Sequence, residues 1–309
     1  MARAPFVLLL PALCGFQEPS APIKWAVKLD SRFTLSYSYL EQYRNDSVQK
    51  GVGTRAETVK TSTSINDKRE VDAELSYREI PGREWSLSID LKKISWTYAT
   101  EEAEITLSFT DGKNPQTRVN VKERDKLRMP QAKADAEQRA EHMKRLVAGE
   151  YDLSCDRSGQ VSIIRAGAVD AGFSIFGRAF VQPPCPTDPV TAGQMWKDTI
   201  PQTLPGYREA AVTDLPFKVT ALNEKSITTK GSVTVPLTRP TNPGENINGT
   251  FSLEREFVFS RDGYVQSAKE DYSFKKTVNS KTQFFGGTTT KDESGSASIR
   301  QTLTLKPKK

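Results

Sequence analysis

The sequence predicts a mainly β (α+β) protein whose strands form either one large, curved antiparallel sheet or two joined β halves. Three observations lead to this prediction. Apolar and polar residues alternate along most of the 309 residues, as in strands that bury one face. Turn-forming residue pairs separate the alternating segments. Only two segments change to the spacing of three and four residues that is typical of a helix.

The chain begins with a leader, and we expect residues 1–21 to be a secretory signal peptide. Arg3 precedes a short apolar run that ends at Leu13. The run is shorter than the roughly 20 residues that cross a membrane, and no later segment is apolar enough to be a transmembrane segment. The cleavage site stays open between Gly15 and Ala21. Lipidation of Cys14 is disfavoured, because Leu13 stands where a lipobox needs a small residue.

Strands dominate the first half of the mature chain, residues 22–185. Strict alternation runs over 33–39 and recurs over 71–80, 85–91, 94–98 and 105–109. Lys92-Lys93 interrupts the alternation and predicts a bulge. Hairpin turns are expected at Asn66-Asp67, Asp111-Gly112, Asn223-Glu224, Asp262-Gly263 and Asn279-Ser280.

The first non-β segment predicts a helix over about residues 130–148. Pro130 fits the first helical turn, and Gly149 fits the position just after the last turn. The apolar residues that recur every three or four positions are mostly alanine, which allows a close approach to a sheet: Met129, Ala132, Ala136, Ala140, Met143 and Val147.

A second, short helix is expected over about residues 168–180, where Val169, Phe173, Phe176 and Phe180 share one face. The run Pro183-Pro184-Cys185-Pro186 ends this helix and marks the boundary between the two halves of the chain.

A C-terminal β-rich half, residues 186–309, follows. Its strands are expected over 217–222, 227–237, 248–260, 264–278, 282–290 and 298–306.

Charge and cysteine content limit the partners, disulfides and metal sites that the sequence allows. The net charge is +6, which permits weak attraction to anionic surfaces such as lipid head groups, polysaccharide or nucleic acid. Acidic residues are interspersed throughout, which favours a solvated surface instead, and no specific nucleic-acid partner is expected. Cys155 and Cys185 are disulfide candidates in an oxidising compartment. Such a bond would contribute about 3–4 kcal/mol, and two free buried thiols are the alternative. No cofactor is expected, and a metal site is disfavoured because no second histidine or third mature cysteine accompanies them.

No residues form a catalytic motif. His142 is the only histidine. With no second histidine or nearby cysteine it is not expected to form a histidine-based metal site or a Ser-His-Asp triad, and it is expected at the helix surface. Ser47 and Lys50 match S-x-x-K by chance, because the match lies between expected strands and not at a helix start. Asp156, Asp262 and Asp292-Glu293 are expected to form turns.

Two residue groups leave other functions open. Glu101, Glu102 and Glu104 form an acidic cluster in which Glu102 and Glu104 are expected to share a face. A pair of facing acids would suit a glycosidase, but a solvated strand end explains the cluster equally well.

The four tryptophans are candidates for sugar stacking or cavity lining, although core positions are favoured: Trp25, Trp85, Trp96 and Trp196.

The motif order resembles that of a family of uncharacterised secreted bacterial proteins with two related β-rich halves. The expected helix leads into the segment LVAGEYDLSCDRSGQV. A proline-bounded V-x-x-G-x-x-W motif follows, with Val190, Gly193 and Trp196 at its fixed positions. The segment INGTFSLEREFVFSRDGYV comes later in the chain. The architecture is also similar to lipoprotein-carrier-type half-barrels, in which a curved sheet wraps a helix. Neither resemblance implies a known activity.

We therefore expect an exported, non-enzymatic protein of the periplasm, cell envelope or extracellular space. It would bind a hydrophobic or envelope ligand, such as a lipid, a lipoprotein or another envelope component, on a concave β face. One alternative is a structural envelope protein. The other is an extracellular hydrolase that uses carboxylates.

Overall fold

The computed structural model describes residues 20–21, 31–52, 57–79, 85–122, 129–149, 151–155, 161–162, 175, 189–203, 210–237, 245–262, 264–284 and 287–308. The expected mainly β fold is confirmed: one large antiparallel sheet is accompanied by one long helix. Residues 1–19 of the expected leader, the short helix expected over 168–180 (apart from Ile175) and the side chains of Cys155 and Cys185 lie outside the described residues. Ile175, described singly, is fully buried.

The elements follow in the order β1 (Ser20–Ala21), β2 (Arg32–Val52), β3 (Thr58–Glu79), β4 (Trp85–Thr100), β5 (Ala103–Thr110), β6 (Gln116–Val121), α1 (Met129–Ala148), β7 (Tyr151–Cys155), β8 (Val161–Ser162), β9 (Val190–Thr191), β10 (Met195–Thr203), β11 (Ala210–Leu222), β12 (Ser226–Pro236), β13 (Glu245–Ser260), β14 (Val265–Phe284) and β15 (Gly287–Pro307). Strands β1 and β9 form a small separate sheet.

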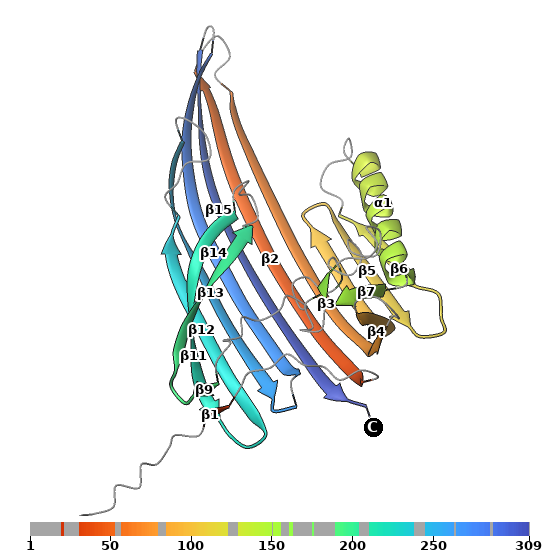
Figure 1. The fold of residues 1–309 in the computed structure, drawn as a ribbon. Coiled ribbons are helices and arrows are strands. Elements are labelled where there is room, and N and C mark those ends of the chain that lie inside the picture. Colours follow the sequence, from red (N-terminus) through yellow and green to blue (C-terminus); the bar gives the residue numbers. More distant parts are fainter. Residues whose placement is uncertain are drawn as a thin grey trace, which may run out of the picture.

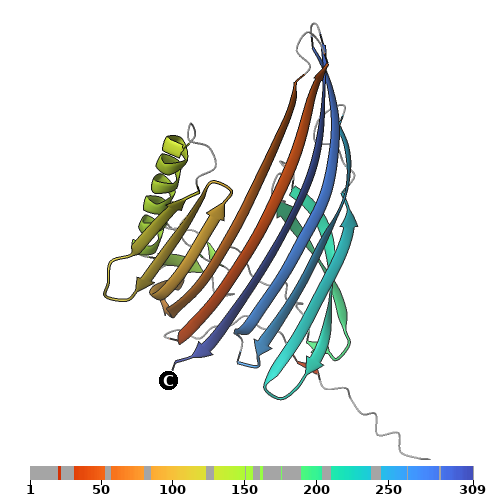
Figure 2. The ribbon, with the colours of Figure 1, turned by 180° about the vertical axis from the view of Figure 1, so that it is seen from behind.

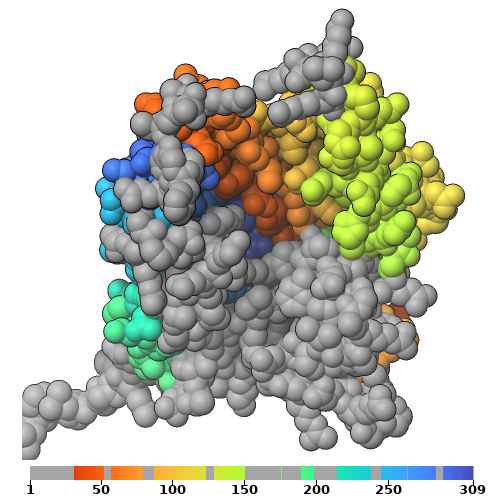
Figure 3. Space-filling model, turned by 90° about the horizontal axis from the view of Figure 1, so that it is seen from above, coloured from red at the N-terminus to blue at the C-terminus, as the bar shows by residue number. Residues whose placement is uncertain are grey.

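The large sheet joins the two ends of the chain. Its strand order is β10-β11-β12-β13-β14-β15-β2-β3-β4-β5-β6, so the last strand lies beside the first long strand. The β15–β2 register runs from Pro307 opposite Phe33 to Thr288 opposite Val52. Figures 1 and 2 show these long strands side by side, with α1 at the far β5–β6 end. Seen from above, the described strands form an arc (Figure 3).

The alternation predicted for β2 and its neighbours defines an inner, buried face. Phe33, Leu35 and Tyr37 are almost fully buried, whereas Thr34 and Ser36 between them are exposed. The bulge predicted at Lys92-Lys93 is confirmed. Lys93 pairs with Asp72 and Leu91 pairs with Ala73, so Lys92 has no residue opposite. The extra residue shifts the alternation by one position, so that Leu91 before it and Ile94 after it are both buried.

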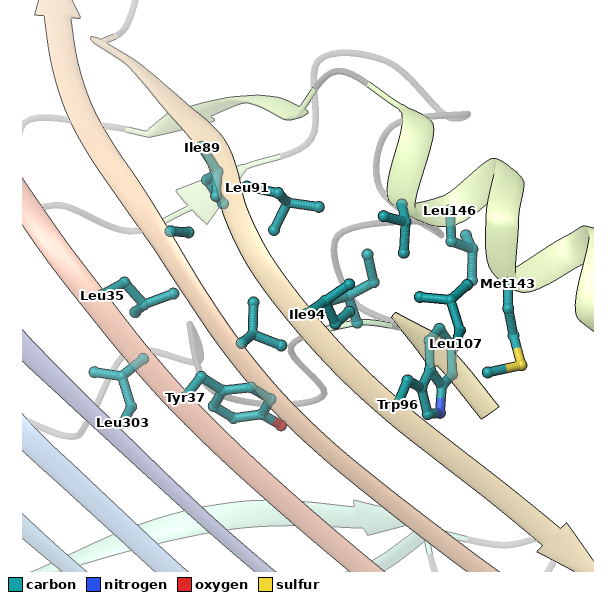
Figure 4. Packing of buried hydrophobic residues seen from close by; sticks show 14 of the residues in the cluster. Leu35, Tyr37, Ile89, Leu91, Ile94, Trp96, Leu107, Met143, Leu146 and Leu303 are labelled. Carbon is teal, nitrogen blue, oxygen red and sulfur yellow. The ribbon is translucent and has the colours of Figure 1, made fainter. Parts of the chain in front are cut away.

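Helix α1 forms where the alanine pattern predicted it. Its buried residues Ala136, Ala140 and Met143 pack against the inner side chains of β4 and β5, including Trp96 and Leu107 (Figure 4). This cluster continues along β2, β3 and the end of β15. A second cluster, built around fully buried Phe217, Phe251 and Phe259, fills the inner face of β11–β14.

Several expected turns are wrong. The turns at Asp111-Gly112, Asn223-Glu224 and Asp262 do separate strands. In contrast, Asn66-Asp67 lies inside β3, Asn279-Ser280 lies inside β14 and Asp292-Glu293 lies inside β15. These residues have partners on both neighbouring strands, and the continuous ladder outweighs their local turn preference. Ser47 and Lys50 likewise lie within β2, not between strands.

Candidate functional site

A row of polar side chains crosses the buried inner face of the sheet. We call it the polar row. Its members are direct cross-strand neighbours on β13, β14, β15, β2, β3 and β4: Arg255, Glu270, Gln301, Tyr39, Arg69 and Trp96. Each occupies a position that the alternation assigns to the core. Buried charges are costly unless they are paired, so the partners of these groups decide what the row can do.

The first half of the row is a closed hydrogen-bond chain. Arg255 Nε donates to Glu270 Oε2, and the two side chains are only 6% and 10% exposed. Gln301 Nε2 donates to Glu270 Oε1 at 3.0 Å, and the Tyr37 hydroxyl donates to Gln301 Oε1 at 3.2 Å. The charge of Glu270 is therefore balanced by Arg255, and both of its oxygens have donors.

The second half is built around Arg69. Arg69 Nε donates to Asp67 Oδ1 at 3.0 Å, and Trp96 Nε1 donates to the same oxygen at 2.8 Å. The guanidinium carbon lies 4.6 Å from the ring centroids of both Tyr39 and Trp96, a cation–π arrangement. Arg69 Nη1 also donates to the backbone oxygen of Ile175 at 3.3 Å, so this half of the row binds a distant part of the chain.

Burial changes the acidity of the row. It raises the pKa of the Tyr37 and Tyr39 hydroxyls well above the ordinary value, since a phenolate would be desolvated there, and nearby carboxylates add to the effect. For Arg69, burial acts to lower the pKa, but the hydrogen bonds and charge of Asp67 outweigh it, and the net pKa is raised. The row therefore holds neutral phenols and a permanent guanidinium cation.

A groove lies beside the row, between α1 and the β4–β5 hairpin. We call it the α1 groove. Its volume is about 750 Å³, within the usual size range of small-molecule sites. Its apolar lining consists of Tyr98, Ala103, Ile105, Ala132 and Ala136. Tyr98 pairs directly with Asp67, so the groove adjoins the polar row.

Charged side chains line the remainder of the α1 groove. Three lie along α1 at spacings of three residues: Arg139, His142 and Arg145. The Arg139 guanidinium carbon lies 4.4 Å from the Tyr98 ring centroid. The acidic residues of the lining are Glu102, Asp135 and Glu141. The groove therefore combines an apolar floor with a charged rim.

The outer face of the sheet has a different character. A shallow hollow there, of about 580 Å³, is lined largely by hydroxyl and charged side chains such as Ser252, Asp271 and Arg300. Its ion pairs are exposed, as in the Lys230–Glu254 pair. Such pairs add little stability. The apolar part of this lining comes from strand residues alone, such as Leu40, Val233 and Ile299, whereas the α1 groove is formed between a helix and the sheet.

The residues singled out from the sequence do not assemble into one site. His142 lies at the helix surface as expected, but it also lines the α1 groove. Glu102 lines the groove, whereas Glu104 alternates with buried Ala103 and Ile105 and so faces outward. The expectation that these two acids share a face is wrong, because β5 begins only at Ala103. Glu101 instead accepts a hydrogen bond from Ser62 at 2.9 Å.

The tryptophans likewise lie at different places in the structure. Trp96 is buried in the first core cluster, and Trp196 stacks on Phe217 with ring centroids 5.6 Å apart. The side chains of Trp25 and Trp85 lie outside the described residues. Within the described part of the chain, no group of three histidine, cysteine or acidic side chains is placed to hold a metal ion.

The polar row was missed from the sequence, although its signal is visible there. Asp67 and Arg69 continue the phase of buried Val71, and Arg255 stands between buried Leu253 and Phe257. A charged residue in phase with core positions indicates a buried ion pair or a site. The sequence does not reveal the pairing partners, because they lie on strands whose order was unknown.

Comparisons with known proteins identify no relative. No protein-family profile matches the chain, and no curated protein matches it. The similar solved structures include an outer membrane channel from Pseudomonas putida F1, at 9% identity over 93% of this chain and 98% of that chain, with a TM-score of 0.18.

Two further similar structures have comparable scores. The type IV competence pilus secretin PilQ of V. cholerae is 10% identical over 91% of this chain and 62% of that chain, with a TM-score of 0.15. The toluene transporter TodX of P. putida is 8% identical over 90% of each chain, with a TM-score of 0.15. TM-scores this low establish no common fold. Among the described residues, no helix is both long and apolar enough to span a membrane.

Proposed function

We propose that this chain is an exported, non-enzymatic protein that binds a hydrophobic or cell-envelope ligand on the inner face of its sheet. The α1 groove is the observation that carries the proposal. Its floor joins Tyr98 and Ile105 of the sheet to Ala132 and Ala136 of α1, and its volume of about 750 Å³ suits a lipid-sized molecule.

The chemistry of the polar row supports binding over catalysis. A general acid or base needs a proton-transfer partner on the substrate within hydrogen-bond reach. Asp67 and Glu270, the buried carboxylates of the inner face, are each held by an arginine and a second donor. These bonds favour a fixed framework beside the groove, and the carboxylate-hydrolase alternative gains no support from them.

A structural envelope role is the second candidate. It is favoured by the close packing of the inner face, where Leu35, Leu75, Leu87 and Ile94 are almost completely buried. A sheet with a closely packed core is as suitable for a structural protein as for a ligand-binding protein. The two functions differ in whether the α1 groove is occupied in the protein as the cell makes it.

The test is native mass spectrometry of the exported protein after gentle purification, followed by organic extraction. We expect a co-purifying lipid-sized mass. Gln138→Trp, which places a large side chain in the groove lining, should reduce its occupancy, whereas Ala134→Trp on the exposed side of α1 should not. A clean apo mass for the wild type would overturn the proposal in favour of a structural role.

The same intact mass tests two sequence predictions. The position of the mature N-terminus would locate the cleavage of the leader expected at residues 1–21. A deficit of two hydrogens, restored by reduction, would establish the proposed Cys155–Cys185 bond. Residues 22–185 and 186–309 remain our proposed halves.

A further inference from the structure

We propose that the α1 groove selects a lipid with an anionic head group, and that Arg139 and Arg145 hold that head group. This inference rests on the proposed function and adds the chemical class of the ligand. A hydrocarbon chain would lie along the apolar floor, and a phosphate or carboxylate head would lie at the end of the groove formed by the second half of α1.

The two arginines differ from the other cations of α1. Lys133 pairs with Glu137 at 3.9 Å, and Lys144 pairs with Glu141 at 2.6 Å. Arg139 and Arg145 form no ion pair with any carboxylate of the described chain, although both line the groove. Guanidinium groups bind carboxylate and phosphate oxygens through two parallel N–H donors. Two such groups remain available on one wall.

The Tyr98 ring fixes one of these groups in place. The Arg139 guanidinium lies over the ring at 4.4 Å, which limits the side-chain freedom that a ligand would otherwise have to restrict. Arg139 and Arg145 are six residues apart on α1, or about 9 Å along its axis.

The acidic groups of the lining are paired or lie apart from these two arginines. Glu141 is engaged by Lys144, and Asp135 accepts a hydrogen bond from Gln131 at 2.7 Å, toward the start of α1. Glu102 belongs to the β4–β5 hairpin on the opposite wall. Arg139 and Arg145 lie in the second half of α1 and Asp135 lies in its first half, so an anionic head group is favoured near the two arginines.

The floor supplies the other half of the recognition. Ala132, Ala136 and Ile105 are nearly buried at the base of the groove, and the half-buried Tyr98 supplies aromatic surface beside them. Each methylene group that leaves water for such a surface contributes about 0.8 kcal/mol before the costs of binding. A charged head alone would forgo this contribution, which argues for an amphiphile over a free anion.

The experiment measures binding of three probes to delipidated protein by calorimetry: a twelve-carbon alkyl phosphate, an uncharged alkyl glucoside of the same chain length, and inorganic phosphate. We expect the alkyl phosphate to bind at least about tenfold more tightly than either of the others. Arg139→Gln combined with Arg145→Gln should reduce alkyl phosphate affinity by about tenfold or more and leave alkyl glucoside affinity unchanged.

Arg118→Gln combined with Lys133→Gln is the matched control, because it removes two exposed cations that do not line the groove. It should bind all three probes like the wild type. Equal affinity for both amphiphiles, or unchanged binding by the groove variant, would overturn head-group selection while leaving a hydrophobic-ligand function intact. Tight binding of inorganic phosphate alone would identify a free-anion site and overturn the lipid assignment. Failure of both amphiphiles to bind would overturn both proposals.

Discussion

At the scale of residues, the inner face departs from a purely apolar core at a few charged positions. Asp67, Arg69, Arg255 and Glu270 lie on the same face as buried apolar residues of their strands, such as Val71 on β3 and Leu253 on β13. Replacing a buried ion pair by apolar residues is often neutral or stabilising, so such pairs are not needed for stability alone. The Arg255–Glu270 pair joins β13 to β14, so a register slip between these strands would leave each charge without its partner. Asp67 and Arg69 both lie on β3 and would stay paired.

Loss of one partner should therefore be severe. Glu270→Gln keeps the side-chain shape but leaves the Arg255 cation buried without its counter-ion, and we expect the free energy of unfolding to fall by about 3 kcal/mol. Glu254→Gln, in the exposed pair with Lys230, should cost less than about 1 kcal/mol. Urea unfolding measures both, and equal costs would contradict a buried pair.

The buried phenols predict a loss of stability in alkali. Because burial raises the folded-state pKa of Tyr37, the unfolded chain gives up this proton first as the pH rises. The unfolded state then binds fewer protons, so the free energy of unfolding should decrease with pH above about 10. Tyr37→Phe should reduce the slope of this decrease between about pH 9 and pH 11. An unchanged slope in urea titrations would show that Tyr37 ionises normally.

At the residue scale, the sequence predicts those features that depend on local chemistry. The bulge at Lys92 was predicted from two adjacent lysines within an alternating segment. Sequence reasoning failed at Asn66-Asp67, because the Asp67 carboxylate is fixed by Arg69 and by Trp96 on the next strand. The local turn preference of Asn66-Asp67 is weaker than the backbone ladder and these non-local hydrogen bonds together, so the strand continues.

At the scale of elements, α1 was the most predictable part of the molecule. Its predicted range of about 130–148 differs by one residue from the observed Met129–Ala148, because spacing, Pro130 and Gly149 all indicate the same helix. The α1 groove was not predictable. It joins residues 98–105 to residues 132–145, and only the placement of α1 on the β4–β5 hairpin brings them together.

The alanines of α1 set its distance from the sheet. Ala136→Leu would force a larger side chain into the first core cluster and should lower the free energy of unfolding by about 1–3 kcal/mol. Ala134→Leu makes the same change on the exposed side of the helix and should be nearly neutral. Thermal unfolding compares the two. Equal midpoints would mean that α1 does not pack closely.

The lengths of the strands were underestimated. Strict alternation in β2 covers residues 33–39, but the strand continues to Val52. Beyond Tyr43 the only apolar side chains of β2 are Val48 and Val52, and periodicity no longer identifies a strand. The strand persists because β3 and β15 supply backbone partners along both of its edges.

At the scale of the whole molecule, the β15–β2 ladder makes one sheet out of both parts of the chain. The first core cluster already crosses this ladder, since Leu303 and Leu305 of β15 pack with Leu35 and Tyr37 of β2. The strand order that produces this contact could not be predicted, because hairpin signals identify consecutive neighbours but not the pairing of the first long strand with the last.

We expect the two core clusters to unfold together. Trp96 reports on the first cluster and Trp196 packs against the second. Two variants, each retaining one of these tryptophans and carrying phenylalanine at the other three tryptophan positions, should have the same urea midpoint by fluorescence, because the shared ladder couples the clusters. Midpoints that differ beyond error would contradict this coupling.

The central position of β15 also constrains how the molecule comes into being. Until the last strand emerges from synthesis or export, β2 presents one unpaired backbone edge along its length, and such edges are sites of misassociation. Pairing Phe33 with Pro307 closes a loop of almost the entire chain, which makes folding intrinsically slow. The incomplete chain would therefore depend on a chaperone for longer than the finished protein would, and a C-terminal truncation would be rejected as unfolded, not tolerated as a shorter sheet.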